Sequence, residues 1–121
     1  PGVKAQRTRD FGAEVILTGD DFQAAAAAVP ALVASRGLTL VHPYDDPLVI
    51  AGQGTVALEI AASGVDLDVL LVPVGGGGLI AGCAIAMQAS SPRTRVLGVQ
   101  SERYPSMAIA LTPEELAFRD E

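Results

Sequence analysis

Val72-Pro73-Val74-Gly75-Gly76-Gly77-Gly78-Leu79-Ile80-Ala81-Gly82 is the stretch of sequence that decides the fold. It joins an apolar run of strand length, residues 68–73, to an apolar segment of helical length, residues 79–89. Four consecutive glycines place no Cβ atom in this turn, so backbone N–H groups can converge on an anion. The helix behind them directs its free N–H groups and its positive dipole end to the same place. The stretch therefore predicts a strand, a phosphate-binding turn and a helix.

A flexible glycine-rich linker or a tight turn without a ligand is the alternative to a phosphate site. A linker is polar at its ends, whereas these glycines lie between two strongly apolar segments, which favours the phosphate site. Lys-Ser or Lys-Thr does not follow the glycines, which excludes a P-loop of the GxxxxGK[ST] type. A dinucleotide site stays open, because Gly76-x-Gly78-x-x-Ala81 fits the pattern GxGxxG/A and Glu102 follows the next strand at roughly the expected distance.

Strands alternate with helices along the rest of the chain. We expect helices over residues 1–11, 21–35, 48 or 55 to 63, 79–89 and from about 105, and strands over residues 13–17, 38–41, 68–73 and 95–100. Asp20 or Asp21 is expected to cap the second helix, and Pro30 to kink or split it. This order predicts an α/β fold of three layers, in which a mostly parallel sheet carries helices on both faces.

Composition excludes several classes of protein. Of the 121 residues, 50% are hydrophobic and 18% are charged, which suits one compact domain with a core. The net charge is −6 and the 8 basic residues are scattered, so no basic stripe for nucleic acid is present. The chain shows neither a signal segment nor an apolar run of about 18 residues, which predicts a protein without a membrane partner. The single cysteine excludes an internal disulfide, and a reducing, cytoplasmic compartment is expected.

Two further motifs precede the glycine stretch. They are His42-Pro43-Tyr44-Asp45-Asp46-Pro47 and Val49-Ile50-Ala51-Gly52-Gln53-Gly54-Thr55, followed by Glu59. Together with Val72 to Gly82, this combination resembles the pyridoxal-phosphate-dependent threonine/serine dehydratases and the serine racemases close to them. Residues 12–17 and 96–99 match strands of the same family. The resemblance covers residues 1–111 in unbroken order.

The resemblance implies part of a tryptophan-synthase-β-like fold, which has two α/β domains with the cofactor between them. Residues 1–41 would be the end of the small N-terminal domain. Residues 42–111 would be the start of the large domain, which binds the cofactor's phosphate. Residues 112–121 depart from the family and are predicted to form an acidic, helix-like tail. The chain thus resembles an internal fragment of such an enzyme.

The same resemblance implies the chemistry. The backbone of Gly75, Gly76, Gly77, Gly78 and Leu79 would hold the phosphate of pyridoxal 5′-phosphate. The family reaction is α,β-elimination, which converts L-threonine or L-serine to a 2-oxo acid and ammonia. The implied enzyme is a cytoplasmic homo-oligomer that acts on a small-molecule amino acid and binds no nucleic acid. Threonine, serine and racemase activities are not distinguished by these residues.

In the family, a lysine in a Ser-Phe-Lys-like motif, well upstream of all the motifs above, forms a Schiff base with the cofactor. Lys4 is the lysine of this sequence, but it follows Pro-Gly-Val and resembles an exposed helix lysine without that role. No catalytic residue is therefore assigned in this chain, and we expect it to be inactive alone. The alternatives are a non-catalytic binding or assembly module and an NAD-type dinucleotide-binding domain.

Several other reactive side chains receive structural roles. His42 lies in a proline-flanked loop without an evident partner, and it is not expected to act as a general base. Asp45 and Asp46 are expected to form a turn, and Cys83 to be a small core residue. Gln100 stands where serine racemases and many dehydratases carry a glutamate that contributes to a cation site. No metal site is therefore predicted.

Overall fold

The computed structural model describes residues 2–103 and 105–111, and these divide into two compact units. The first unit extends to Leu40 and the second begins at Val41. The acidic tail predicted over residues 112–121 lies outside the described residues.

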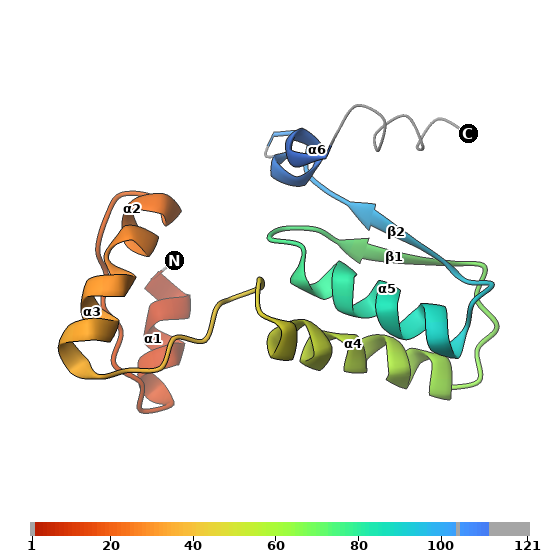
Figure 1. Ribbon diagram of the computed structural model, residues 1–121, viewed down its shortest axis with the longest axis horizontal. Helices are drawn as coiled ribbons and strands as arrows, with labels where there is room; N and C mark the ends of the chain where they lie inside the picture. Colours follow the sequence, from red (N-terminus) through yellow and green to blue (C-terminus); the bar gives the residue numbers. More distant parts are fainter. Residues whose placement is uncertain (1, 104, 112–121) are drawn as a thin grey trace. The chain divides into compact units, whose positions relative to one another are not determined.

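Over residues 2–40 the chain forms three helices, α1 (Gly2–Asp10), α2 (Phe22–Ala27) and α3 (Val29–Arg36) (Figure 1). Asp21 caps α2, because its carboxylate accepts a hydrogen bond from the Ala24 N–H at 2.8 Å. Pro30 lies in the first turn of α3, where a missing N–H group is tolerated. The predicted long helix is therefore split in two, as expected, and Gly37 ends α3 in the left-handed conformation with φ 61°.

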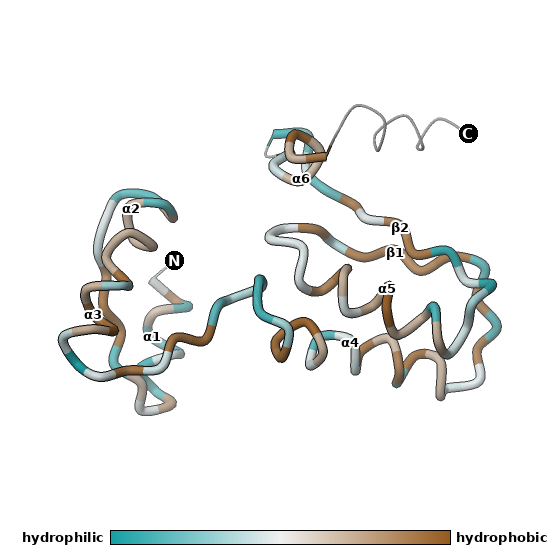
Figure 2. The backbone as a smooth tube through the Cα atoms, viewed as in Figure 1, coloured by the Kyte–Doolittle hydropathy of each residue, from teal (hydrophilic) through white to brown (hydrophobic). Residues whose placement is uncertain are grey.

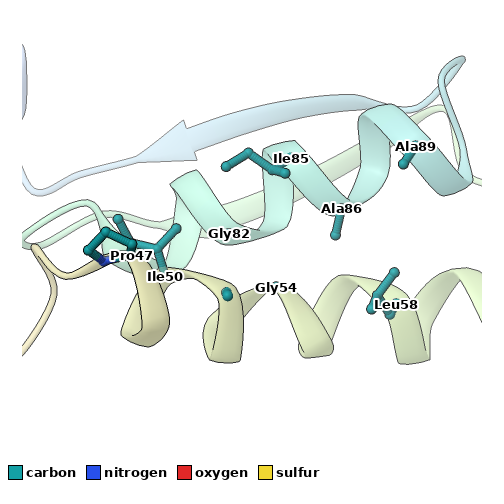
Figure 3. A pocket seen from close by; sticks show the side chains of 9 residues that line it. Pro47, Ile50, Gly54, Leu58, Gly82, Ile85, Ala86 and Ala89 are labelled. Atoms are coloured by element: carbon teal, nitrogen blue, oxygen red, sulfur yellow. The ribbon is translucent and has the colours of Figure 1, made fainter.

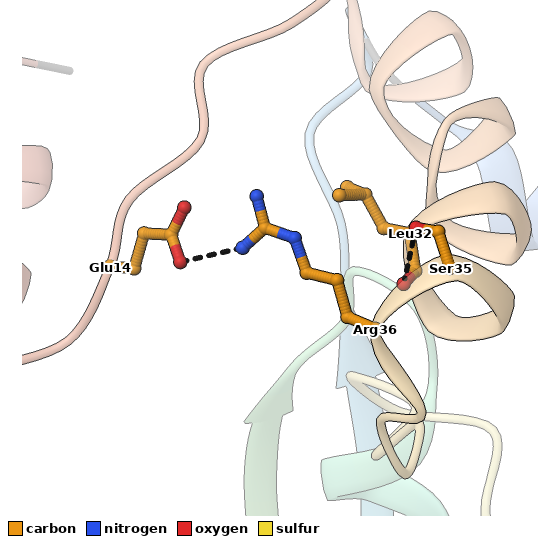
Figure 4. A network of polar contacts seen from close by, with 4 residues as sticks. All are labelled: Glu14, Leu32, Ser35 and Arg36. Carbon is orange, nitrogen blue, oxygen red and sulfur yellow. Dashed lines mark hydrogen bonds and ion pairs between the residues drawn. The ribbon is translucent and has the colours of Figure 1, made fainter.

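The strands predicted over residues 13–17 and 38–41 are wrong, because both segments carry no regular secondary structure. A strand requires a neighbour that pairs with its N–H and C=O groups, and within the described ranges only β1 and β2 of the second unit pair in this way. Glu14 of the first segment instead forms an ion pair with Arg36, 2.6 Å long (Figure 4). Surface pairs of this kind contribute about 0–1 kcal/mol, too little to fix a segment.

The second unit contains, within its described residues, three helices and two strands: α4 (Pro47–Ala62), β1 (Val69–Pro73), α5 (Gly78–Ser90), β2 (Arg95–Val99) and α6 (Ser106–Ala110). Each matches a predicted element to within one or two residues. Asp46 begins α4, since its carboxylate accepts hydrogen bonds from the N–H groups of Leu48 at 2.8 Å and Val49 at 3.1 Å. Asp46, which the sequence predicted to form a turn with Asp45, is thus the N-cap residue of α4.

The sheet of this unit is parallel, and α5 is the crossover between its strands (Figure 1). The strands pair in register from Val69 opposite Arg95 to Pro73 opposite Val99, and most of their residues are hydrophobic (Figure 2). One face packs against α5 through Leu70, Val72 and Val96. The α/β class and the parallel sheet are confirmed. In the described part of the chain, α5 covers one face, and Leu71 on the other face is 64% exposed.

Two glycines set the distance between α4 and α5. A Cβ atom on Gly54 would lie 2.9 Å from the carbonyl oxygen of Gly82, and one on Gly82 would lie 2.6 Å from the Gly54 nitrogen. The two backbones are therefore in direct contact, with no space for a side chain between them. The core lies beside this contact and consists of four buried side chains, Ala57, Val72, Cys83 and Met87.

Gly82→Ala is expected to lower the free energy of unfolding by about 1–3 kcal/mol, because the added methyl group forces the two helices apart. Gly52→Ala is the matched control on α4: a Cβ atom there meets nothing within 4 Å. Alanine also favours a helix over glycine by about 0.5–1 kcal/mol, so this control should be neutral or stabilising. Urea denaturation followed by circular dichroism measures both. Equal effects of the two substitutions would contradict the close helix contact.

Cys83 is 1% exposed, and burial raises the pKa of its thiol, an effect that a contact with the Ala57 backbone partly offsets. We expect Ellman's reagent to modify the folded chain at least about tenfold more slowly than the chain in urea. Cys83→Ser combined with Ala84→Cys moves the thiol to an exposed neighbour and should remove this protection. Fast labelling of the folded wild-type chain would refute the packing of α5.

The folded chain holds the thiol proton of Cys83 more tightly than the unfolded chain does. The free energy of unfolding should therefore fall as pH rises above about 9.

Candidate functional site

The glycine loop lies at the carboxyl end of β1 and leads directly into α5. The Val74 N–H donates to the Val99 carbonyl at 2.8 Å, which extends the strand pairing one residue beyond β1. Gly77 then turns the chain with φ 94°, a left-handed conformation that favours glycine. Gly77 is also the N-cap residue of α5 and, as a glycine, has no side chain that could accept a hydrogen bond from the first turn of the helix. The N–H groups of that turn are thus directed out of the helix end, as an anion requires.

A hollow of about 240 Å³ lies at this helix end. It is lined by Pro43, Tyr44, Gln53, Pro73, Gly75, Gly76, Gly77, Gly78 and Leu79. All five residues predicted to hold a phosphate, Gly75 to Leu79, therefore lie together on its wall. A water molecule takes about 30 Å³ in the liquid, so the hollow has room for a phosphate group. Gln53 is the residue that α4 contributes to this wall.

Three of the four glycines are in contact with neighbours that leave no space for a side chain. The ring of Tyr44 lies where a Cβ atom of Gly76 would be, and the Tyr44 carbonyl oxygen is 2.6 Å from the corresponding position at Gly78. The terminal methyl group of Met107 is 2.7 Å from that position at Gly77. A Cβ atom at Gly75 meets nothing within 4 Å. The loop is therefore held between Tyr44 and α6.

His42 shapes the turn that presents Tyr44. Its Nδ1 accepts hydrogen bonds from the N–H groups of Asp45 at 2.7 Å and Tyr44 at 3.4 Å. The rings of His42 and Tyr44 meet edge to face, with centroids 4.7 Å apart. Because Nδ1 is committed to these backbone groups, this atom is not available to accept a proton from a substrate. Asp45 is exposed and supplies its N–H group to the same turn.

A larger hollow, of about 520 Å³, lies between α4 and α5 (Figure 3). Aliphatic side chains and glycines line it, among them Ile50 and Leu58 of α4 and Ile85 and Ala86 of α5. It has no charged or hydrogen-bonding side chain in its wall. An apolar surface of this kind suits a hydrophobic contact and gives no means of holding a phosphate.

The described residues give no support for a metal centre or a membrane span. No group of three or more His, Cys, Asp or Glu side chains that could hold a metal ion occurs in residues 2–103 and 105–111. Among the helices of the same ranges, none is both long and apolar enough to cross a membrane. Lys4 lies exposed on α1.

A parallel βαβ unit with a glycine loop at the carboxyl end of its first strand is typical of α/β proteins that bind a phosphate-bearing cofactor. Residues 1–119 match the sequence pattern of a protein family whose description is "Pyridoxal-phosphate dependent enzyme". The chain belongs to this family, and its cofactor class is therefore pyridoxal phosphate, as the three motifs predicted.

Known members of the family show which reactions related chains perform. The catabolic L-threonine dehydratase TdcB of Escherichia coli K12 is 47% identical over 116 residues, which are 96% of this chain and 35% of that protein. The crystal structure of a threonine deaminase from T.th. has a TM-score of 0.76 and 48% identity, covering 84% of this chain and 34% of that one. A pyridoxal 5′-phosphate-dependent aspartate racemase has a TM-score of 0.80 and 34% identity, covering 84% and 31%. The chain spans about a third of the length of the curated relatives it matches.

The structure adds residues that the sequence did not assign to the site. Tyr44, Gln53 and Met107 all contact the glycine loop or line its hollow. The motifs around Tyr44 and Gln53 were visible in the sequence, but the place of each beside a hollow with a loop more than twenty residues away was not. For Met107 the sequence carries no signal.

Gly76→Ala should lower the free energy of unfolding by about 1–3 kcal/mol, because the new methyl group collides with the Tyr44 ring. Gly75→Ala, one residue earlier and free of neighbours, should change it by less than about 0.5 kcal/mol. The two variants are compared by urea denaturation.

A double-mutant cycle tests the cause. In a Tyr44→Ala background the cost of Gly76→Ala should fall by at least about 1 kcal/mol, because the colliding ring is gone. An unchanged cost in that background would show that Tyr44 does not lie on the loop.

Proposed function

We propose that this chain is the part of a pyridoxal-phosphate-dependent threonine/serine dehydratase that holds the cofactor's phosphate. The observation that carries the proposal is the hollow at the start of α5, whose wall consists mainly of the Gly75–Gly78 backbone and Leu79. Relatives named threonine dehydratase and threonine ammonia-lyase support the reaction class. In the proposed assignment, residues 1–41 end the small domain, and residues 42–111 begin the large domain.

The residues present fit the cofactor's phosphate. Gly75, Gly76, Gly77 and Gly78 line the hollow and have no side chain, so they present backbone alone to it. Backbone N–H groups at a helix start hold a phosphate dianion without a counter-charge from a side chain. When bound, pyridoxal 5′-phosphate supplies the electron sink for elimination of the substrate hydroxyl group. The role of this chain is then to fix the phosphate end, while Tyr44 covers one side of the loop.

The proposed enzyme needs a lysine at the cofactor, and this chain offers only Lys4. Lys4 is exposed in a surface helix whose residues are all unburied. A lysine that forms a Schiff base is ordinarily desolvated or lies beside another cation, which favours its neutral form. Lys4 is not desolvated in α1. We therefore infer that elimination requires residues beyond these 121 and that the chain is inactive alone.

We propose that the protein is a homo-oligomer and that it is located in the cytoplasm. Apolar side chains such as Leu71, Ile85 and Leu97 are 64%, 65% and 42% exposed, which favours association with a second copy. The same observation supports the alternative function, a non-catalytic assembly module. Cofactor binding distinguishes the two functions, because an assembly module does not need to bind a cofactor. Analytical ultracentrifugation measures the association, and a monomer at micromolar concentration would exclude both forms of self-assembly.

The purified chain, supplied with pyridoxal 5′-phosphate, should form no 2-oxo acid from L-threonine or L-serine above the rate without protein. The Escherichia coli relative, assayed in parallel, is the positive control. Steady formation of 2-oxo acid by the 121-residue chain would contradict the inferred lack of a catalytic lysine.

Cofactor choice is measured separately with pyridoxine 5′-phosphate, which carries the phosphate but has no aldehyde to react with surface amines. We expect saturable binding by fluorescence titration, competition by inorganic phosphate and no binding of NAD. Binding of NAD in place of pyridoxine 5′-phosphate would favour the dinucleotide alternative.

A further inference from the structure

Gln100 follows β2 in the same way that Val74 follows β1, and its side chain lies between these two strand ends and α6. The side-chain amide donates to the Val74 carbonyl at 3.4 Å and to the Ser106 hydroxyl at 3.1 Å. Val74 immediately precedes the first glycine of the loop. One side chain therefore joins the entrance of the glycine loop to the segment that leads into α6.

The other end of the Gln100 amide holds the first turn of α6. Its Oε1 accepts hydrogen bonds from the N–H groups of Met107 at 3.2 Å and Ala108 at 3.3 Å. Pro105, at the cap position, makes no side-chain cap. Gln100, which lies outside α6, thus accepts the hydrogen bonds from the first turn that an N-cap side chain would otherwise accept.

The full hydrogen-bonding capacity of the amide is used. An amide group has two N–H donors and an oxygen with two lone pairs, and each has a partner here. The opposite orientation of the amide would place its N–H groups against two N–H donors and its oxygen against the Val74 carbonyl. In this chain the arrangement therefore suits an amide: a carboxylate supplies the acceptors but has no donor for the Val74 carbonyl.

Helix α6 in turn touches the loop. The terminal methyl group of Met107 lies 2.7 Å from the place of a Cβ atom on Gly77, the residue that turns the chain into α5 with φ 94°. Gln100 accordingly acts on the loop from two directions. It holds Val74 at the entrance directly, and it holds Met107 against Gly77 through α6.

We propose that Gln100 is a positioning residue for the glycine loop and that its amide sets the affinity of the loop for a phosphate group. The inference rests on the proposed function, because the loop is taken as the phosphate site. Gln100 touches neither the hollow nor its ligand. It acts by keeping the backbone N–H groups of residues 75–78 in one arrangement, so that binding does not have to order them.

Gln100→Glu is the decisive variant, because it keeps the shape and the acceptor oxygens but replaces the donors with a charge that repels the Val74 carbonyl. Gln88→Glu is the matched control. Gln88 is exposed on α5, the helix that follows the glycine loop, and lies ten residues and so about 15 Å from the start of that helix. The two variants share the chemical change and the net charge, and they differ only in where the change is made.

Affinity is measured by fluorescence titration with pyridoxine 5′-phosphate, and the environment of the bound phosphate by ³¹P NMR. Loss of the hydrogen bond to the Val74 carbonyl and the added repulsion should weaken binding by Gln100→Glu at least about fivefold. Gln88→Glu should bind as the wild-type chain does. The ¹⁵N order parameters of Gly75–Gly78 should fall in Gln100→Glu alone. Unchanged affinity and unchanged order parameters in Gln100→Glu would overturn the proposal, even if α6 itself becomes mobile.

A second variant decides the matter if Gln100→Glu does not fold. Met107→Ala leaves every atom of the Gln100 amide in place and removes the contact with Gly77. It should lower the order parameters of the loop in the same way, and unchanged values would count against the coupling through α6. If the wild-type chain binds neither pyridoxine 5′-phosphate nor inorganic phosphate, the proposed function fails. The order parameters then still test whether Gln100 positions the loop.

Discussion

The direct contact between the backbones of α4 and α5, at Gly54 and Gly82, is the constraint on which the second unit depends. The start of α4 carries the turn with Tyr44, and the start of α5 carries the glycine loop. With both helices in contact at glycine, the two starts come close enough for the Tyr44 ring to cover Gly76. A side chain at either crossing glycine would separate the helices and withdraw Tyr44 from the loop. The helix contact and the candidate site are therefore one structural feature.

Glycine serves two physical purposes within the loop. At Gly77 the left-handed backbone conformation is the requirement, since the chain must turn from strand to helix there. At Gly76 and Gly78 the requirement is space, because Tyr44 occupies the positions of their Cβ atoms. Three glycines of the run thus meet distinct local demands, and Gly75 meets none of this kind. The loop is therefore packed against neighbours at residues 76–78, although its sequence is that of a flexible chain.

Prediction from sequence succeeded where structure is set by local pattern. The apolar run before the glycines, the loop itself and the apolar segment behind it gave β1, the turn and α5, because strand length, missing Cβ atoms and helical length are all readable along the chain. It failed for residues 13–17 and 38–41, whose apolar residues indicated strands. A strand forms by pairing with a distant neighbour, and that neighbour is not determined by the segment itself. Gln100 is the same problem in the site: the sequence shows a glutamine after a strand, but not the four groups it joins.

The proposed function separates holding the cofactor from performing the reaction. The proposed phosphate site consists of backbone N–H groups without Cβ atoms, with Tyr44 and Met107 packed around the loop. Elimination depends on a lysine with a lowered pKa, which requires burial or a cationic neighbour. The first set of requirements is met within one βαβ unit and the residues packed on it. The second requires a site closed from solvent, whereas Lys4 is exposed on α1. Members of the family that differ in reaction, dehydratase and racemase alike, can therefore share this unit, because nothing in it specifies what happens at the other end of the cofactor.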